Sequence, residues 1–436
     1  MSGLKKFFLA TVSAEGWPEN SIACDPDLST GSADGSSWED AYQSLQAAIN
    51  ACSGTPDKIL VKARTVTLSS SITVSQACTI YGGFDNSLTG TQGSVEGRSA
   101  SSRTTLDGID TYQIATATAA FTIDAFRFED GSGDGGALYS NGYAGTFVNC
   151  IFDGNTTVSN YGGALYFRDA NVTLTDCEFT NNDAARGIGK GGALAARDSG
   201  TVTATDCTFG SSTNGNIGEQ GGAVAIWGGA GSAFTRCTFA HNACNTSGTE
   251  DGGGCHLDEG THTFTDCIFT YNLAGDDAGA IWQDDSSTVT LNTCLFDNND
   301  ADDDGGAIEQ YSSGGTLNVN NCTFADNSAA DGEAIKAVGT LTVINSIFWD
   351  NTGDEDIDSS GTTSVTYSDV EGGYTGTGNL NIDPNFSAGA GGKPYYQPDT
   401  TSDVITEGNN AAMTDHDILG DDWDDDTMGC YNLDAS

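Results

Sequence analysis

GGALYFRDANVTLTDCEFTNN, residues 162–182, holds the two motifs whose repetition decides the fold, and GGALAARDSGTVTATDCTF at 191–209 repeats them. The first motif is Gly-Gly-Ala followed by an aliphatic residue. Full copies start at Gly135, Gly162, Gly191, Gly221 and Gly305, and degraded copies start at Gly252, Ala278, Gly332 and Asp354. A unit that recurs every 22 to 31 residues indicates a repeat architecture rather than two or three ordinary domains.

The second motif, Cys-x-Phe-x-x-Asn, places like residues at matching positions in successive repeats. Its cysteines are Cys150, Cys177, Cys207, Cys237, Cys267, Cys294 and Cys322. Its aromatic column is Phe152, Phe179, Phe209, Phe239, Phe269, Phe296, Phe324 and Phe348. Three residues after each Phe stand Asn155, Asn182, Ser212, Asn242, Asn272, Asn299, Asn327 and Asn351.

Each repeat contains three short segments that alternate with the period of a β-strand: one after the glycines, one such as 172–174, and one at Cys-x-Phe. The residue before the Cys is often Asp or Asn, types that tolerate the left-handed backbone of a corner. Such residues are Asn149, Asp176, Asp206, Asp266 and Asn321. The variable segment between the Phe and the next glycines reads as a loop that tolerates insertion.

A single coil of this kind cannot bury its own apolar side. Coils stacked about 4.8 Å apart pair every strand with its equivalents above and below, so that Cys, Phe and Asn form ladders. The sequence therefore predicts an all-β, single-stranded right-handed parallel β-helix of about 11 to 13 coils, a rod roughly 50–60 Å long. We expect the ladder cysteines to pack as free buried thiols, while Cys24 with Cys52, or Cys244 with Cys255, could form disulfides.

The two ends of the stack need covers, because open sheet edges invite aggregation. Residues 1–30 form an N-terminal segment that reads either as a short secretion signal or as ordinary chain. Residues 31–56 form a capping helix, which a capping box at 37–40 opens and whose apolar face includes Trp38, Ala41 and Leu45. The β-helix spans 57–378, and 379–436 is the C-terminal cap.

The charge balance is strongly acidic, with 61 Asp and Glu against 15 Lys and Arg and a net charge of −46. This argues against binding to nucleic acid or to anionic membranes, both of which recruit Lys and Arg. No stretch approaches the ~20 apolar residues of a membrane-spanning helix.

The repeats resemble those of the polymorphic outer membrane proteins, and the start of the chain is similar to a wider group of bacterial right-handed β-helix surface proteins. The similarity runs from about residue 31 to 434. The stretches that carry it are Gly35–Trp38, Leu45–Ile49, Thr79–Phe84, Thr104–Gly108, Asp383–Phe386 and Asp415–Tyr431. The resemblance implies secretion and an adhesive or structural role at a cell surface.

Many β-helices act on polysaccharides, and one face of this chain offers a matching pattern. Arg168 and Arg197 each lie six residues after their glycines and are each followed by Asp, so they should stack, with Trp227 next in the same column. Tyr139, Tyr166 and Trp282 fall in a neighbouring outward column. These residues read either as a glycan-binding face or as solvated charges and rings packed under a loop.

Acidic residues gather in the variable loop before each Gly-Gly-Ala, so stacked coils should carry an acidic edge that Ca²⁺ could bridge. These residues are Glu250, Asp251, Asp276, Asp277, Asp302, Asp303, Asp304, Asp331 and Asp354. A second Ca²⁺ candidate is the C-terminal run with Asp415, Asp417 and Asp421, which matches part of a Ca²⁺ loop.

We find no catalytic constellation, because the four histidines are scattered and a chain at −46 repels acidic polymers. The sequence predicts an extracellular or cell-surface protein without catalytic activity and with no certain cofactor. Its role would be structural or adhesive, through self-association into a filament or layer, or through a glycan or cell-surface partner. The alternative is a carbohydrate-active β-helix, lyase-like or glycan-binding, that uses Tyr166, Arg168, Arg197 and Trp227.

Overall fold

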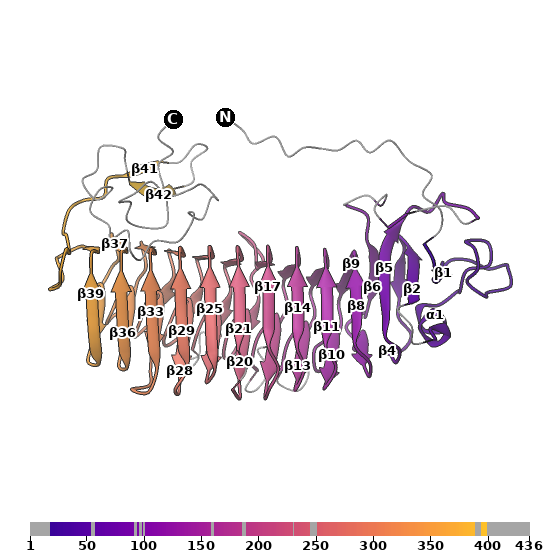
Figure 1. Ribbon diagram of the computed structural model, residues 1–436, viewed down its shortest axis with the longest axis horizontal. Helices are drawn as coiled ribbons and strands as arrows, with labels where there is room; N and C mark the ends of the chain where they lie inside the picture. Colours follow the sequence, from indigo (N-terminus) through magenta and orange to yellow (C-terminus); the bar gives the residue numbers. More distant parts are fainter. Residues whose placement is uncertain are drawn as a thin grey trace.

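The computed structural model describes residues 18–53, 57–90, 94–95, 98, 101–157, 161–184, 189–229, 231–244, 251–388 and 394–398. Over these residues the chain forms a right-handed parallel β-helix, as the repeats predict (Figure 1). Each full coil adds one strand to each of three parallel sheets, in the order sheet C, sheet A, sheet B.

Among the described residues, sheet A has 13 strands, sheet B has 12 and sheet C has 11. Sheet A consists of β1 (Ser21–Cys24), β2 (Asp57–Lys62), β5 (Cys78–Phe84), β8 (Phe121–Asp124), β11 (Gly145–Val148), β14 (Val172–Thr175), β17 (Val202–Thr205), β21 (Ser232–Thr235), β25 (Thr261–Thr265), β29 (Thr288–Asn292), β33 (Thr316–Asn320), β36 (Thr340–Ile344) and β39 (Thr362–Thr366). Sheet B consists of β3 (Thr65–Thr67), β6 (Thr104–Asp107), β9 (Phe126–Glu129), β12 (Ile151–Asp153), β15 (Glu178–Thr180), β18 (Thr208–Phe209), β22 (Thr238–Ala240), β26 (Ile268–Thr270), β30 (Leu295–Asp297), β34 (Thr323–Ala325), β37 (Ile347–Trp349) and β40 (Asp369–Val370). Sheet C consists of β4 (Ile72–Val74), β7 (Ala115–Ala117), β10 (Leu138–Asn141), β13 (Leu165–Arg168), β16 (Leu194–Arg197), β20 (Val224–Trp227), β24 (Cys255–Asp258), β28 (Ile281–Asp284), β32 (Ile308–Gln310), β35 (Ile335–Ala337) and β38 (Ile357–Ser359).

The core is built from columns of identical residues that run along the rod. In sheet B, Phe152 lies opposite Phe179, and Phe179 lies opposite Phe209. The rings from Phe128 to Phe348 stack with centroids 4.6 to 5.0 Å apart and are fully buried. This column contributes a large share of the buried apolar area that stabilises the rod.

A buried asparagine ladder follows the Phe column. From Asn155 to Asn327, each Asn amide nitrogen donates to the Oδ1 atom of the Asn on the next coil at 2.8 to 3.0 Å, and to the backbone carbonyl of a Phe on the preceding coil. The expectation for Ser212 is wrong, because Asn216 occupies this rung between Asn182 and Asn242. Four extra residues precede Asn216 in that coil, so the three-residue spacing after Phe209 does not hold there.

The variable side of the coil is more regular than a free loop. After the Asn ladder, four coils add a short strand to a fourth parallel sheet: β19 (Ile217–Gly218), β23 (Ala243–Cys244), β27 (Leu273–Ala274) and β31 (Asp300–Ala301).

The corners of the coil need left-handed backbone. The five residues before the ladder cysteines that the sequence marks as corners, Asn149 and Asp176 among them, have φ between 51° and 56°. At the glycine corner, Gly162 has a φ of 62°, and a Cβ on Gly163 would lie 2.1 Å from the carbonyl oxygen of Gly192 on the next coil. The paired glycines therefore permit both the turn and the close approach of coils.

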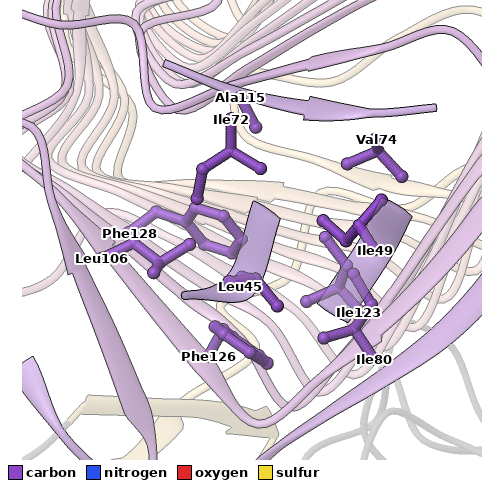
Figure 2. A pocket seen from close by; sticks show the side chains of 10 residues that line it. All are labelled: Leu45, Ile49, Ile72, Val74, Ile80, Leu106, Ala115, Ile123, Phe126 and Phe128. Carbon is purple, nitrogen blue, oxygen red and sulfur yellow. The ribbon is translucent and has the colours of Figure 1, made fainter. Parts of the chain in front are cut away.

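One short helix, α1 (Leu45–Ala51), covers the N-terminal end of the core. Figure 2 shows Leu45 and Ile49 facing Ile72, Val74 and Phe128 of the first coils, around an apolar void of about 10 Å³. The capping box predicted at 37–40 does not open this helix, which begins after its N-cap, Ser44. The backbone amide of Asp40 does bond the Ser37 hydroxyl at 3.2 Å, but Tyr42 then pairs with Cys24 of β1, which prevents a helix from continuing there.

Trp38 and Ala41 consequently do not share a helical face with Leu45. They pack on the other side of sheet A, where the Trp38 ring lies 5.6 Å from that of Phe84. Strand β1 falls in the range that the sequence assigns to the N-terminal segment, and it is the first strand of sheet A.

At the C-terminal end, Asn379 covers the edge of the last coil by donating to the carbonyl of Val365 at 2.9 Å and accepting from the amide of Ser368. A two-stranded antiparallel ribbon, β41 (Phe386–Ala388) and β42 (Pro394–Pro398), follows. Most of the predicted C-terminal cap, and residues 1–17 of the predicted secretion signal, lie outside the described residues.

The described cysteines are all buried and form no disulfide with one another, including Cys24, Cys52, Cys244 and Cys255, for which the sequence left disulfides open. No helix within the described part of the chain has the length and apolar character needed to span a bilayer.

Candidate functional site

The outward face of sheet C gathers most of the side chains that the sequence marks for chemistry. Along β13, Leu165 and Phe167 join the core, so Tyr166 and Arg168 point away from it. Strand pairing extends these two positions into two outward columns. The column that passes through Tyr166 contains Tyr139, Tyr166, Ala195, Ala225, His256, Trp282, Glu309 and Lys336. The column that passes through Arg168 contains Arg168, Arg197 and Trp227, followed on the next two strands by Asp258 and Asp284.

The first part of this face, which we call the basic–aromatic half, consists of Tyr161, Tyr166, Arg168, Lys190, Arg197 and Trp227. The Tyr161 ring lies 5.2 Å from that of Tyr166 and 5.3 Å from that of Trp227. The Arg197 guanidinium lies 5.6 Å from the Tyr161 ring centre, and the Lys190 ammonium lies 5.2 Å from that of Trp227. These distances are within the range of favourable cation–π contact.

The two arginines share one carboxylate. Arg168 Nε donates to Asp198 Oδ2 at 2.8 Å, and Arg197 Nε lies 3.4 Å from the same oxygen. The Arg168 side chain is 44% exposed and Arg197 is half-buried, so Asp198 holds both guanidinium groups at the surface. An anionic ligand that reaches this face would meet two oriented cations.

The structure brings together Arg168, Arg197 and Trp227 as the sequence predicts, but it does not expose all the predicted rings. Tyr166 is only 5% exposed and Trp282 only 6%, because neighbouring rings cover them. Burial raises the pKa of Tyr166 to about 12. The open part of the face is therefore narrower than a continuous strip from Tyr139 to Trp282.

Sequence reasoning missed Tyr161 and Lys190, which lie in the variable loop and pair with each other in register. Their place in the repeat could have revealed them, because each of these two residues stands immediately before a Gly-Gly-Ala motif. Burial lowers the pKa of Lys190, while the carboxylates of Asp258, Asp284 and Asp251 act in the opposite direction.

The second part of the face, which we call the acidic half, consists of Asp251, Asp258, Asp277, Asp284 and Glu309. Here the imidazole of His256 stacks on Trp282 with centroids 4.3 Å apart, and its Nε2 lies 3.9 Å from Asp258 Oδ2. Burial lowers the pKa of His256. His256 Nδ1, Asp258 Oδ1 and Trp282 Nε1 are buried without a hydrogen-bond partner among the described residues.

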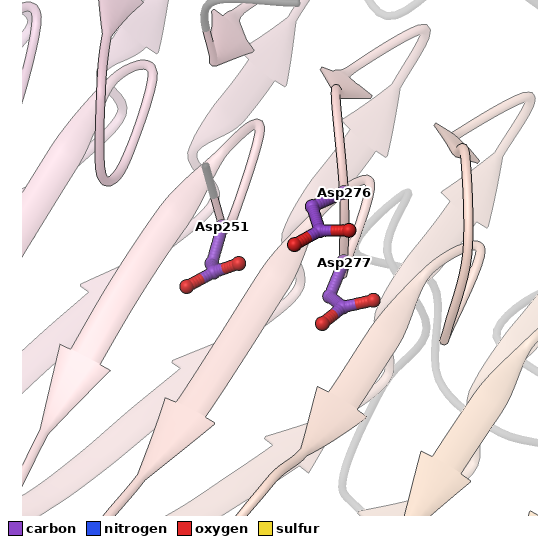
Figure 3. Close-up of side chains that lie close together, drawn as sticks. All are labelled: Asp251, Asp276 and Asp277. Atoms are coloured by element: carbon purple, nitrogen blue, oxygen red, sulfur yellow. The ribbon is translucent and has the colours of Figure 1, made fainter. Parts of the chain in front are cut away.

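The predicted acidic edge is present where successive loops stack, and Asp251, Asp276 and Asp277 form one close group in it, which we call the aspartate cluster. One oxygen from each of these carboxylates lies within 4.8 Å of the others. Figure 3 shows Asp251 on one coil beside Asp276 and Asp277 on the next. Burial raises the pKa of Glu309 to about 9, and the neighbouring carboxylate of Asp277 adds to that shift.

Other parts of the acidic edge have cations of their own. Lys336 binds Asp304, Asp331 and Asp358, at 3.5 Å and 3.6 Å for the first two. Asp258, Asp284 and Asp285 also come close together, and the Lys190 ammonium interacts with Asp258 and Asp284 as well as with Asp251 of the aspartate cluster. The other predicted Ca²⁺ residues, Asp415, Asp417 and Asp421, lie outside the described residues.

Comparisons with known proteins bear on the fold. A family model described as "right handed beta helix region" matches residues 107–218 and 189–364. The crystal structure of pectate lyase Pel9A is similar with a TM-score of 0.50 and 12% identity, over 95% of this chain and 96% of that one. At such low identity this likeness shows the fold alone.

Two further structures are similar at 12% identity. ORF18 of Geobacillus virus E2 gives a TM-score of 0.41 over 80% of this chain and 61% of that one. A mutant of the PL6 family alginate lyase AlyGC gives 0.36 over 85% and 58%. No curated protein matches the sequence.

Proposed function

The chain belongs to the right-handed β-helix family, and on this premise we propose that it is an extracellular, non-catalytic surface protein that binds acidic glycans through the basic–aromatic half of sheet C. The observation that carries the proposal is the contact of Arg197 with Tyr161 and Trp227, on a surface that Lys190 and Arg168 extend. Sugars stack on aromatic rings, and guanidinium groups bind carboxylate or sulfate through paired hydrogen bonds.

The repeating backbone suits a polymeric ligand. Equivalent positions recur about every 4.8 Å along the rod, so a chain of sugars can meet the same kind of contact on successive coils. The net charge of −46 opposes an acidic polymer at long range, but physiological salt screens charges that lie more than about 8 Å away. The local cations then dominate at the contact itself.

The surface role follows from the wider pattern of the repeats, which resemble those of the polymorphic outer membrane proteins. Location outside the cell, adhesion and assembly into a filament or layer belong to this proposal. Electron microscopy of the native protein would distinguish single rods from filaments.

Glycan binding is testable with polygalacturonate oligomers, heparin-derived oligosaccharides and neutral cello-oligosaccharides as probes. We expect an acidic probe to bind the wild-type protein. Arg197→Ala or Trp227→Ala should weaken this binding and raise the Kd by about 10-fold or more. Arg236→Ala is the matched control, because Arg236 forms an exposed ion pair with Asp206 away from sheet C. If no acidic probe binds the wild-type protein, or if the Arg197→Ala variant binds as tightly, the proposal is wrong.

A second candidate function, polysaccharide lyase activity, is favoured by Lys190. Its pKa is lowered by burial, and its ammonium interacts with Arg197 and with the carboxylates of Asp258, Asp284 and Asp251. A lysine of lowered pKa can act as a general base, and in a lyase it would remove the proton next to a uronate carboxyl. Pel9A, the similar solved structure, is a pectate lyase.

The lyase alternative is tested by following unsaturated product from polygalacturonate and alginate in ultraviolet absorbance. Turnover that Lys190→Met abolishes and Arg236→Ala retains would establish the alternative and overturn the non-catalytic proposal. Binding without turnover would support the first proposal.

A further inference from the structure

We propose that the aspartate cluster binds one divalent cation of the Ca²⁺ type beside Glu309, and that this ion ties successive coils together. This inference is independent of glycan binding, because it concerns the acidic half and the edge of the coils rather than the basic–aromatic half.

The geometry of the aspartate cluster fits a single ion. Two oxygens bound at about 2.4 Å to the same Ca²⁺ can be at most about 4.8 Å apart. Asp251, Asp276 and Asp277 each offer an oxygen inside that limit. The three carboxylates come from two successive coils, and Figure 3 shows them side by side at the loop edge.

Glu309 supplies a second and independent observation. It lies on β32, one coil beyond Asp277, and is only 3% exposed. Within the described part of the chain its Oε2 atom is buried without a hydrogen-bond partner, and its carboxyl group interacts with both Asp277 and Asp251. A buried carboxylate oxygen without a partner destabilises the fold, and a cation at the cluster would provide the missing interaction.

The strand register also explains why the carboxylates meet here. The Gly252 amide bonds the carbonyl of Asp277 at 3.0 Å, and the Asp304 amide bonds a side-chain oxygen of Asp277 at 3.0 Å. The stacked backbone therefore holds these acidic side chains at the spacing of the coils, where they repel one another unless a cation lies between them.

The ligand set selects the type of ion. All four side chains offer carboxylate oxygens, which favour hard cations over Zn²⁺ or Cu²⁺. Ca²⁺ accepts six to eight oxygens in flexible arrangements, whereas Mg²⁺ requires near-octahedral geometry and keeps several waters. Carboxylates from successive coils, two of them neighbours in one loop, suit the larger ion.

The test uses the full-length, chelator-treated protein and CaCl₂ as the probe. Titration calorimetry and melting scans at fixed ionic strength would compare the wild type with Asp277→Asn and Glu309→Gln. The matched control is Asp354→Asn, which removes an exposed charge from the corresponding loop of another coil. We expect Ca²⁺ to raise the Tm of the wild type and of Asp354→Asn by several degrees.

In both cluster variants we expect one equivalent of Ca²⁺ binding to be lost or weakened at least 10-fold, with a smaller Tm shift. In chelator the cluster variants should melt at or above the wild-type temperature, because Asp277→Asn removes a repelling charge and Glu309→Gln keeps a neutral group beside Asp277. Unchanged Ca²⁺ binding in the variants would overturn the proposal, as would lower stability of both variants in chelator. An equal Tm shift from MgCl₂ would overturn the assignment to Ca²⁺.

Discussion

The two halves of the outward face of sheet C share one backbone and differ in chemistry. In the position just before the glycine corner, the basic–aromatic half has Tyr161 and Lys190, and the acidic half has Asp251 and Asp277. In the neighbouring columns, arginine and tryptophan give way to aspartate and glutamate. The inward columns do not change, since the Phe stack and the Asn ladder run through both halves.

This difference shows how a solenoid separates stability from function. Each coil contacts only its neighbours, so the inward residues must match along the whole rod, while an outward residue can change from one coil to the next. A basic binding surface and an acidic cation site can therefore lie a few coils apart without a change of fold.

The strongest test of the comparison replaces one core ring in each half. Phe179→Ala, beneath the basic–aromatic half, and Phe296→Ala, beneath the acidic half, should each lower the free energy of unfolding by about 3–5 kcal/mol. Both rings are fully buried in the same column, so the two losses should be alike. Urea denaturation measures them, and a loss confined to one variant would show that the interiors also differ.

A second effect should separate the halves by pH. Burial raises the pKa of Glu309 to about 9 and also raises the pKa of Asp284 and Asp304, whereas the Arg168 hydrogen bond lowers the pKa of Asp198. A carboxyl with a raised folded-state pKa contributes stability that is fully present below its unfolded value, near 4.5 for Glu309, and is lost as pH rises toward 9. A carboxyl with a lowered pKa loses its contribution as pH falls.

In chelator, therefore, lowering the pH from 8 to 5 should raise the free energy of unfolding by about 4 kcal/mol through Glu309. Denaturation curves at the two pH values measure this change, and Glu309→Gln should remove the Glu309 share of it, while Asp356 and Asp369, whose pKa values burial raises to about 7 and about 6, keep theirs. Asp198→Asn, in the other half, is the control and should leave the gain intact. A gain in Glu309→Gln as large as that of the wild type would contradict this assignment to Glu309.

The smallest effect concerns the exposed Arg168–Asp198 pair. Because Arg168 lies in solvent, Arg168→Ala should change the free energy of unfolding by less than about 1 kcal/mol while it weakens glycan binding. Denaturation and binding measured on the same variant would sharpen the distinction between a functional surface and a structural one. A loss of stability above that limit would show that the arginine supports the fold.

The sequence anticipated the interior more completely than the surface. Stacked Cys, Phe and Asn positions and the left-handed corners follow from the motifs, because each obeys one spacing on every coil. The rule failed at Ser212, where an insertion shifts the Asn rung to Asn216, and at residues 37–40, where a bridge between Tyr42 and Cys24 replaces the helix. Both failures arise where a contact from another coil overrides a local pattern.

By itself, the sequence determined the solenoid, because a periodic pattern of apolar residues can be buried only by stacking one coil on the next. It also marked Arg168, Arg197 and Trp227 as one column. Only the tertiary structure decided which loop residues join that column, that Tyr166 is covered, and that Glu309 meets the aspartate cluster. Loop lengths vary between coils, so the distance between side chains on neighbouring loops depends on the path of the folded backbone rather than on spacing along the chain.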